Sequence, residues 1–125
     1  MALFRVYFTT LEGDKMSRVP MTDGSGSWFN PESSVLFKED RNFDGRNHIS
    51  VATGSQWDHE SLYYTRSGKW VLHSFSDWQG ALDTYEVIEE STAVSWLISN
   101  SHQDLNELPE SVRTAIEAGF KDAEI

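Results

Sequence analysis

The segment from Asn47 to Gly80 contains the side chains of this chain that are best suited to chemistry. It holds three of the four histidines, and with two of the carboxylates in the segment they form the candidate catalytic set His48, Asp58, His59, Glu60 and His73. Imidazole and carboxylate groups move protons at neutral pH and bind divalent metals. A catalytic reading of this chain would therefore be a metal-dependent or acid–base hydrolase built on these five residues.

The spacing of these residues gives that reading limited support. A two-residue turn at Ser67-Gly68 would pair Leu62 with His73 and make Glu60 a diagonal neighbour of His73. The chain has no His-Glu-x-x-His motif, no Gly-x-Ser-x-Gly elbow and no cysteine. We therefore expect no bound metal and no cofactor.

Aromatic side chains are concentrated in the same segment and suggest a binding surface instead. Trp57, Tyr63, Trp70 and Trp78 are the candidate contact residues, since tryptophan and tyrosine dominate interface hot spots. Successive strand residues point to opposite faces of a sheet, so some of these rings must lie away from the helix-covered face. They would either be covered by the long loops that precede Gly45 or form an exposed patch.

The charge of the chain is strongly negative and unevenly distributed. The net charge is −10, and residues 81–125 carry ten acidic but only two basic side chains. Such a surface repels phosphate backbones, so we expect no direct binding to nucleic acid. A protein partner with a basic surface fits better, with Glu107, Glu110 and Glu117 as candidate contacts. One version of this idea is a nucleic-acid mimic that presents carboxylates to a DNA-binding protein.

Alternating apolar residues predict strands at 3–10, 35–37, 48–53, 62–65, 69–75 and 84–88. Gly68 is expected to supply a positive φ in a hairpin between the fourth and fifth of these strands. A short helical turn is predicted at Pro31, capped by Asn30. Residues 22–27 and 77–80 read as loop or turn.

Helical spacing replaces strand alternation after Ile88. Glu89–Asn100 predicts one helix, and 105–120 predicts a second with Pro109 in its first turn and a buried stripe at Val112, Ile116 and Phe120. Strands followed by helices indicate an α+β fold. We expect a single domain over residues 1–125, with an antiparallel sheet of four to six strands and two C-terminal helices packed on one face.

Composition argues against a membrane-spanning or secreted protein. No apolar run reaches the roughly 20 residues that a membrane helix needs, and the N-terminus lacks the pattern of a signal peptide. Together with the absence of cysteine, this favours a cytoplasmic protein without membrane contact.

The pattern Thr53-Gly54-Ser55-Gln56-Trp57, Gly68-x-Trp70-Val71-Leu72, Trp78-Gln79-Gly80 and Ala93-x-x-Trp96-Leu97 resembles small uncharacterised bacterial proteins. The resemblance covers roughly the C-terminal two-thirds of the chain. It implies no activity and transfers no catalytic residue, and it points to no characterised family.

Three functional readings follow from the sequence. The first is a small acidic protein that binds and modulates or inhibits another protein and has no catalytic activity of its own. The second is the hydrolase described above, and the third is a structural homodimer joined through sheet edges or exposed aromatics. We favour the first, because the acidic C-terminal segment would steer a basic partner toward the aromatic residues.

Overall fold

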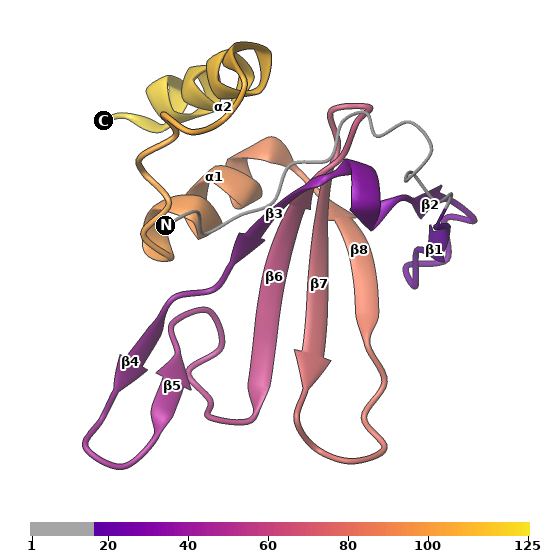
Figure 1. Cartoon of the computed structure of the whole chain (residues 1–125), viewed down its shortest axis with the longest axis vertical. Helices are drawn as coiled ribbons and strands as arrows, with labels where there is room; N and C mark the ends of the chain where they lie inside the picture. The colour runs from indigo at the N-terminus through magenta and orange to yellow at the C-terminus, as the bar shows by residue number, and fades with distance from the viewer. Residues whose placement is uncertain (1–16) are drawn as a thin grey trace.

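A computed structural model describes residues 17–125 and is built around a four-stranded antiparallel sheet. The sheet order is β3 (Val35–Lys38), β6 (Asp58–Tyr64), β7 (Trp70–Ser76) and β8 (Thr84–Ile88). Two helices follow it, α1 (Glu90–Ser99) and α2 (Glu110–Ala123) (Figure 1). The predicted α+β class is thereby confirmed. The strand predicted at 3–10 lies outside the described residues.

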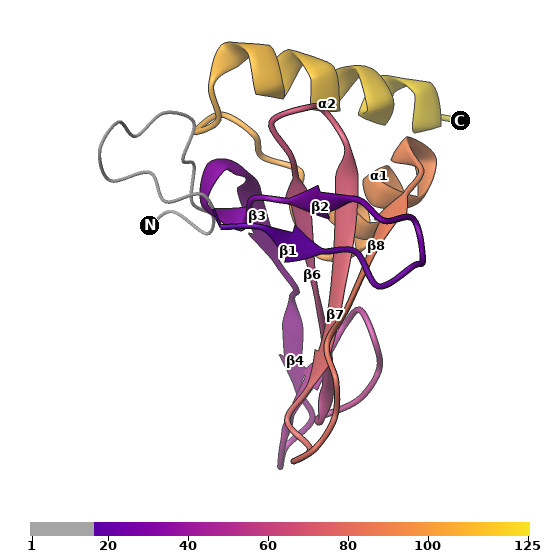
Figure 2. The same cartoon turned by 90° about the vertical axis from the view of Figure 1, so that its right-hand side faces the viewer.

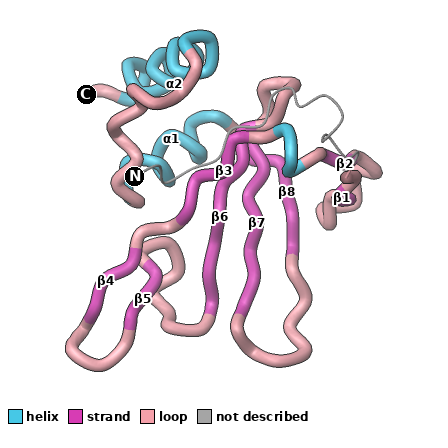
Figure 3. The backbone as a smooth tube through the Cα atoms, in the orientation of Figure 1, coloured by secondary structure: helices cyan, strands magenta, loops and turns pink. Residues whose placement is uncertain are grey.

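Two small strand pairs and one 3-10 turn lie outside this sheet. A two-stranded hairpin of β1 (Val19–Pro20) and β2 (Trp28–Phe29) precedes it, followed by the 3-10 turn η1 (Pro31–Ser33). A second small pair, β4 (Arg41–Phe43) and β5 (His48–Ser50), comes between β3 and β6 in the chain and lies outside the four-stranded sheet (Figure 3). The sequence did not predict β4, whose three residues are all exposed. The strand predicted at 48–53 ends early, because the amide of Gly54 bonds back to the carbonyl of Ser50 and closes a turn.

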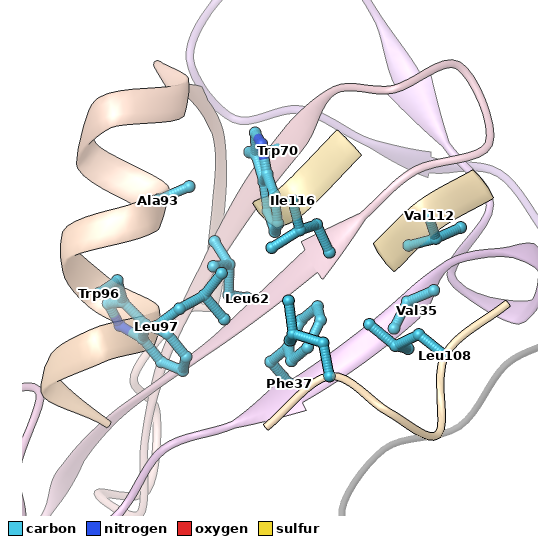
Figure 4. Close-up of a cluster of buried hydrophobic side chains, with 11 residues drawn as sticks. Val35, Phe37, Leu62, Trp70, Ala93, Trp96, Leu97, Leu108, Val112 and Ile116 are labelled. Atoms are coloured by element: carbon cyan, nitrogen blue, oxygen red, sulfur yellow. The ribbon is translucent and has the colours of Figure 1, made fainter. Parts of the chain in front are cut away.

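The main core lies between one face of the sheet and the two helices (Figure 4). Leu62 and Trp70 from the central strands are 0% and 5% exposed, and Leu97 and Ile116 from the helices are equally enclosed. Because the same cluster takes residues from α1 and α2, both helices cover this face. Burial of such apolar side chains supplies the largest favourable term in folding.

The opposite face of the sheet is covered by the β1–β2 hairpin. Met21 and Phe29 pack there on Val71, with Tyr63 and Tyr85 beside them. The rings of Phe29 and Tyr63 meet edge to face with centroids 5.1 Å apart. Figure 2 shows the hairpin lying across the sheet on the side away from α1. The outer face is therefore covered near the hairpin, as one of the two sequence alternatives anticipated.

The helical segments begin and end close to where sequence signals predicted. Asn30 caps η1 by accepting a hydrogen bond from the amide of Glu32, and Pro31 opens the turn. Glu89 and Asn100 flank α1. Helix α2 begins at Glu110 rather than at 105, because Leu105 and Leu108 are buried in a turn that precedes Pro109. Within residues 17–125, no helix has the length and apolar character needed to cross a bilayer.

Candidate functional site

The five residues of the predicted catalytic set do not converge on one site. His48 lies on β5 and packs against Phe43, with ring centroids 5.1 Å apart. Asp58 is exposed at the start of β6. The remaining three residues, His59, Glu60 and His73, divide between the two faces of the main sheet. In the described part of the chain, no group of three or more His, Asp or Glu side chains is arranged to hold a metal ion.

The predicted pairing of Leu62 with His73 is wrong by one residue. Leu62 lies opposite Leu72, and His73 lies opposite Ser61. The connecting loop is longer than predicted: Thr65 and Lys69 still share a backbone hydrogen bond of 2.8 Å, which leaves three residues between them. Gly68 has φ +84° there, as expected. Because side chains alternate along a strand, this one-residue shift places Glu60 and His73 on opposite faces.

His73 lies on the hairpin-covered face and is held by local contacts. Its ring stacks on Tyr85 with centroids 4.3 Å apart and an interplanar angle of 8°. Its Nε2 lies 2.9 Å from a carboxylate oxygen of Asp83 in the β7–β8 loop. These contacts give His73 a structural role within a layer of aromatic rings.

Glu60 lies on the helix-covered face and is partly buried. Burial raises the pKa of its carboxyl group, and the charges of Glu39 and Glu86 act in the same direction, although the indole N–H of Trp96 donates a hydrogen bond of 2.9 Å to it. The indole bond is the reason Trp96 can be buried without leaving its polar atom unsatisfied. Glu60 thus ties β6 to α1.

The central charged feature of the molecule is a row of three side chains, Glu39, His59 and Asp77. His59 is 4% exposed; its Nδ1 lies 2.7 Å from Glu39 Oε2, and its Nε2 lies 2.8 Å from Asp77 Oδ2. We call this row the carboxylate–histidine clamp. Burial alone would lower the pKa of His59, but the hydrogen bonds to Asp77 and Glu39 and the charges of both carboxylates raise it overall.

Glu39 holds the clamp on the side of β3. Its carboxylate also accepts hydrogen bonds from the hydroxyl of Ser50 and the amide of Glu60, and it forms an ion pair with Arg41 at 2.9 Å. Burial tends to raise the pKa of Glu39, yet these bonds and the one from His59 lower it overall. Both carboxylate oxygens are therefore occupied by donors.

The clamp fixes the position of the His59 ring between two carboxylates. Both ring nitrogens of His59 are engaged by carboxylates, so neither is directed at a site where a substrate could bind. A general base needs a nitrogen within hydrogen-bond reach of the proton it removes. The sequence had singled out His59 but missed Glu39 and Asp77, which no motif links to it. The pairing of β3 with β6, with Lys38 opposite Ser61, is what brings Glu39 beside His59.

Two tryptophans form an exposed pair next to the clamp. Trp57 is 42% exposed and Trp78 is 59% exposed, and their ring centroids lie 4.9 Å apart. Trp57 immediately precedes β6, and Trp78 lies in the β7–β8 loop. The amide of Asp77 donates a hydrogen bond of 2.9 Å to the carbonyl of Trp57, so a backbone bond joins the clamp to the tryptophan pair.

Hydrogen bonds also fix the backbone on each side of this tryptophan pair. The amide of Trp57 is bonded to the hydroxyl of Ser55 at 2.9 Å, and the amide of Trp78 to that of Ser76 at 3.1 Å. Preorganised aromatic side chains lose less conformational entropy when a partner binds. The backbone that carries the two exposed rings is therefore held by local hydrogen bonds.

The other residues predicted to contact a partner divide into buried and distant sets. Trp70 is 5% exposed and belongs to the main core, and Tyr63 packs in the hairpin-covered cluster. Glu107, Glu110 and Glu117 are exposed on α2 and the turn before it. Figure 1 shows α2 at one end of the molecule and the β4–β5, β5–β6 and β7–β8 connections at the other. The acidic helix and the tryptophan pair therefore do not form one continuous patch.

Comparison with known proteins adds no assignment to this geometry. No protein-family model matches the chain, and neither the curated proteins nor the solved structures compared with it include a match.

Proposed function

We propose that this protein acts by binding another protein, with Trp57 and Trp78 as the anchor of the contact. The observation that carries this proposal is the pairing of two large, exposed aromatic rings on loops whose backbone is fixed by hydrogen bonds. Exposed tryptophans of this kind are the residue type most enriched in binding hot spots. Buried area at the pair would supply the affinity.

The apolar surface at this end of the molecule extends beyond the pair. Phe43 at the end of β4 is 62% exposed, and Leu82 in the β7–β8 loop is 88% exposed. Both elements belong to the end of the molecule that carries the tryptophan pair (Figure 1). Exposed apolar side chains that occur singly need no explanation, but several at one end of a molecule favour an interaction surface there.

The negative charge of the chain favours a partner with a basic surface. The chain has a net charge of −10, and Asp58, Asp77 and Asp83 flank the tryptophan pair in sequence. A partner with a basic surface would be attracted over distances comparable to the Debye length before the rings make contact. The exposed carboxylates of α2 would contribute to this long-range attraction without touching the partner.

A nucleic-acid mimic remains the version of this proposal in which α2 itself makes the contact. In that version Glu107, Glu110 and Glu117 stand in for phosphates, and their neutralisation would abolish binding. The two versions therefore differ in which variant loses the partner. The hydrolase alternative has weaker support, because its five residues do not converge on one site and His59 is held at both nitrogens.

Affinity capture from the native host tests the proposal. The bait is the full chain, compared with the double variant Trp57→Ala/Trp78→Ala and with Trp28→Ala. Trp28 is a matched control, because it is also exposed (48%) but lies on β2. We expect one protein to be captured by the wild type and Trp28→Ala and lost with the double variant. Capture that is equal for all three, or recovery of a second copy of this chain only, would contradict the proposal; the latter result would favour the homodimer.

A further inference from the structure

A pocket of about 550 Å³ lies between the β1–β2 hairpin and the sheet. The β6–β7 loop contributes Arg66 and Lys69 to its lining, and this loop lies at the opposite end of the sheet from the β7–β8 loop (Figure 1). Its apolar lining comes from the hairpin and from the sheet strands beneath it, namely Met21, Trp28, Phe29, Val71 and Val87. A volume in this range is typical of sites that enclose a small organic molecule.

The hairpin that roofs the pocket is fixed to β8. The amide of Thr22 donates to the carbonyl of Tyr85 at 2.8 Å, and the amide of Tyr85 donates to the Thr22 hydroxyl at 2.7 Å. The carboxylate of Asp23 accepts from the amides of Ser25 and Val87 at 3.0 and 3.3 Å. The roof therefore has a defined position over the sheet, and the pocket is largely preformed.

The charge around the pocket is opposite to that of the whole chain. Residues 17–125 contain eight Lys and Arg side chains, and two of them, Arg66 and Lys69, line the pocket. A third, Arg18, lies over the ring of Trp28 at 5.1 Å. Among the described lining residues, Asp23 is the one acidic side chain, and its oxygens are engaged by backbone amides. In a chain of net charge −10, the lining of this pocket thus carries more cationic than acidic side chains.

We propose that the pocket binds a small organic anion with an apolar body, specifically a medium-chain monocarboxylate. The apolar chain would lie against Met21, Phe29 and Val71, and the carboxylate would lie at the rim beside Lys69 and Arg66. The hydroxyls of Ser25 and Ser27 in the hairpin line the same pocket and are suitable donors to a carboxylate. This site shares no residue with the tryptophan pair, so the two proposals succeed or fail independently.

Calorimetric titration with three probes of equal chain length tests the charge requirement. Decanoate, decylammonium and decanol are each added to the full-length protein below their aggregation concentrations. We expect saturable one-to-one binding of decanoate, with decylammonium and decanol each at least about tenfold weaker, since an ionic hydrogen bond contributes roughly that much. Equal binding of decanoate and decylammonium, or no saturable binding of decanoate, would overturn the proposal.

Variants then locate the site. Lys69→Gln is expected to weaken decanoate about tenfold, and Val87→Asp, which adds a negative charge to a half-exposed wall residue, is expected to weaken it further. Lys121→Gln on α2 removes the same charge far from the pocket and should leave affinity unchanged, as should Trp57→Ala/Trp78→Ala. Amide chemical shifts should move at residues 21–34, 65–71 and 87. Shifts centred on the tryptophan pair, or equal weakening by Lys121→Gln, would show that decanoate binds elsewhere and would overturn the assignment.

Discussion

His59 Nδ1 and Glu39 Oε2 lie 2.7 Å apart, and both side chains are only 4% exposed. Glu39 follows β3 and His59 lies on β6, so the β4–β5 pair separates the two residues along the chain. Their contact joins the edge strand β3 to the central strand β6 beside the tryptophan pair. The clamp is thus a structural support placed directly under the surface that we propose binds a partner.

Removing the Glu39 carboxylate should destabilise the protein strongly. Glu39→Ala leaves His59 and the Glu60 amide without their buried acceptor, and loss of one member of a buried ion pair typically costs about 3–5 kcal/mol. Urea denaturation followed by tryptophan fluorescence measures this cost. Glu117→Gln, at an exposed position on α2, is the control and should change stability by less than about 0.5 kcal/mol. A similar small effect for Glu39→Ala would mean that the clamp does not contribute to folding.

The clamp should also make stability depend on pH. The pKa of His59 is raised in the folded state, so its contribution is fully present below the ordinary histidine pKa of about 6.5 and is lost as pH rises through the folded value. The pKa of Glu39 is lowered, so its contribution is present above about 4.5 and is lost as pH falls through the folded value. We expect the stability advantage of wild type over His59→Gln to shrink on the alkaline side.

The measurement is a series of urea unfolding curves for wild type, His59→Gln and the exposed-histidine control His48→Gln. Wild type and His48→Gln should follow the same pH profile, whereas His59→Gln should be flatter above the ordinary histidine pKa. If all three profiles can be superimposed, His59 does not carry a charge in the folded protein that it lacks in the unfolded chain.

Several elements of the fold were predictable because their signals are local. The strand at 84–88 and the helix after Glu89 follow from alternation and helical spacing, and η1 follows from Asn30 and Pro31. β4 was not predictable, because Arg41-Asn42-Phe43 buries no face and carries no alternation. Short exposed strands form through pairing with a neighbour, which the local sequence does not encode.

The candidate site could be predicted only in part. His59, Trp57 and Trp78 were recognised by residue type, but their arrangement depends on strand register. Register in turn depends on one additional residue in the loop at Arg66-Ser67-Gly68, which the sequence pattern cannot fix. Glu39 and Asp77 were missed because they reach His59 only through tertiary pairing.

Replacing Gly119 should separate the two helices. A Cβ at this position would lie 2.8 Å from Cγ2 of Val94 and 2.6 Å from Oε2 of Glu90. Glu90 can move, but Val94 is 1% exposed and enclosed. Gly119→Ala should therefore cost about 1–3 kcal/mol through overpacking, despite the gain of about 1 kcal/mol that alanine offers in a helix.

Thermal unfolding of Gly119→Ala, Val94→Ala and the double variant checks this contact. Because the residues touch, the double variant should be more stable than the sum of the single effects predicts. Additive effects would show that α1 and α2 do not meet at this point.

Binding to the proposed partner should weaken with salt, chiefly through a slower association rate. Long-range attraction by the −10 charge is screened at high ionic strength, whereas contacts of the tryptophan rings are not. Surface plasmon resonance at increasing salt separates the two rates. The triple variant Glu107→Gln/Glu110→Gln/Glu117→Gln should associate more slowly and dissociate at the wild-type rate. Loss of binding in the triple variant would instead support the nucleic-acid-mimic version.

The most direct test of the central claim is the affinity of the captured partner for wild type, Trp57→Ala/Trp78→Ala and Trp28→Ala, measured by calorimetry at one salt concentration. Circular dichroism should first establish that all three are folded. We predict that the double variant binds at least about 30-fold more weakly, the loss expected for a hot spot, and that Trp28→Ala binds like wild type. Equal affinity for wild type and the double variant would contradict the claim that Trp57 and Trp78 anchor the partner.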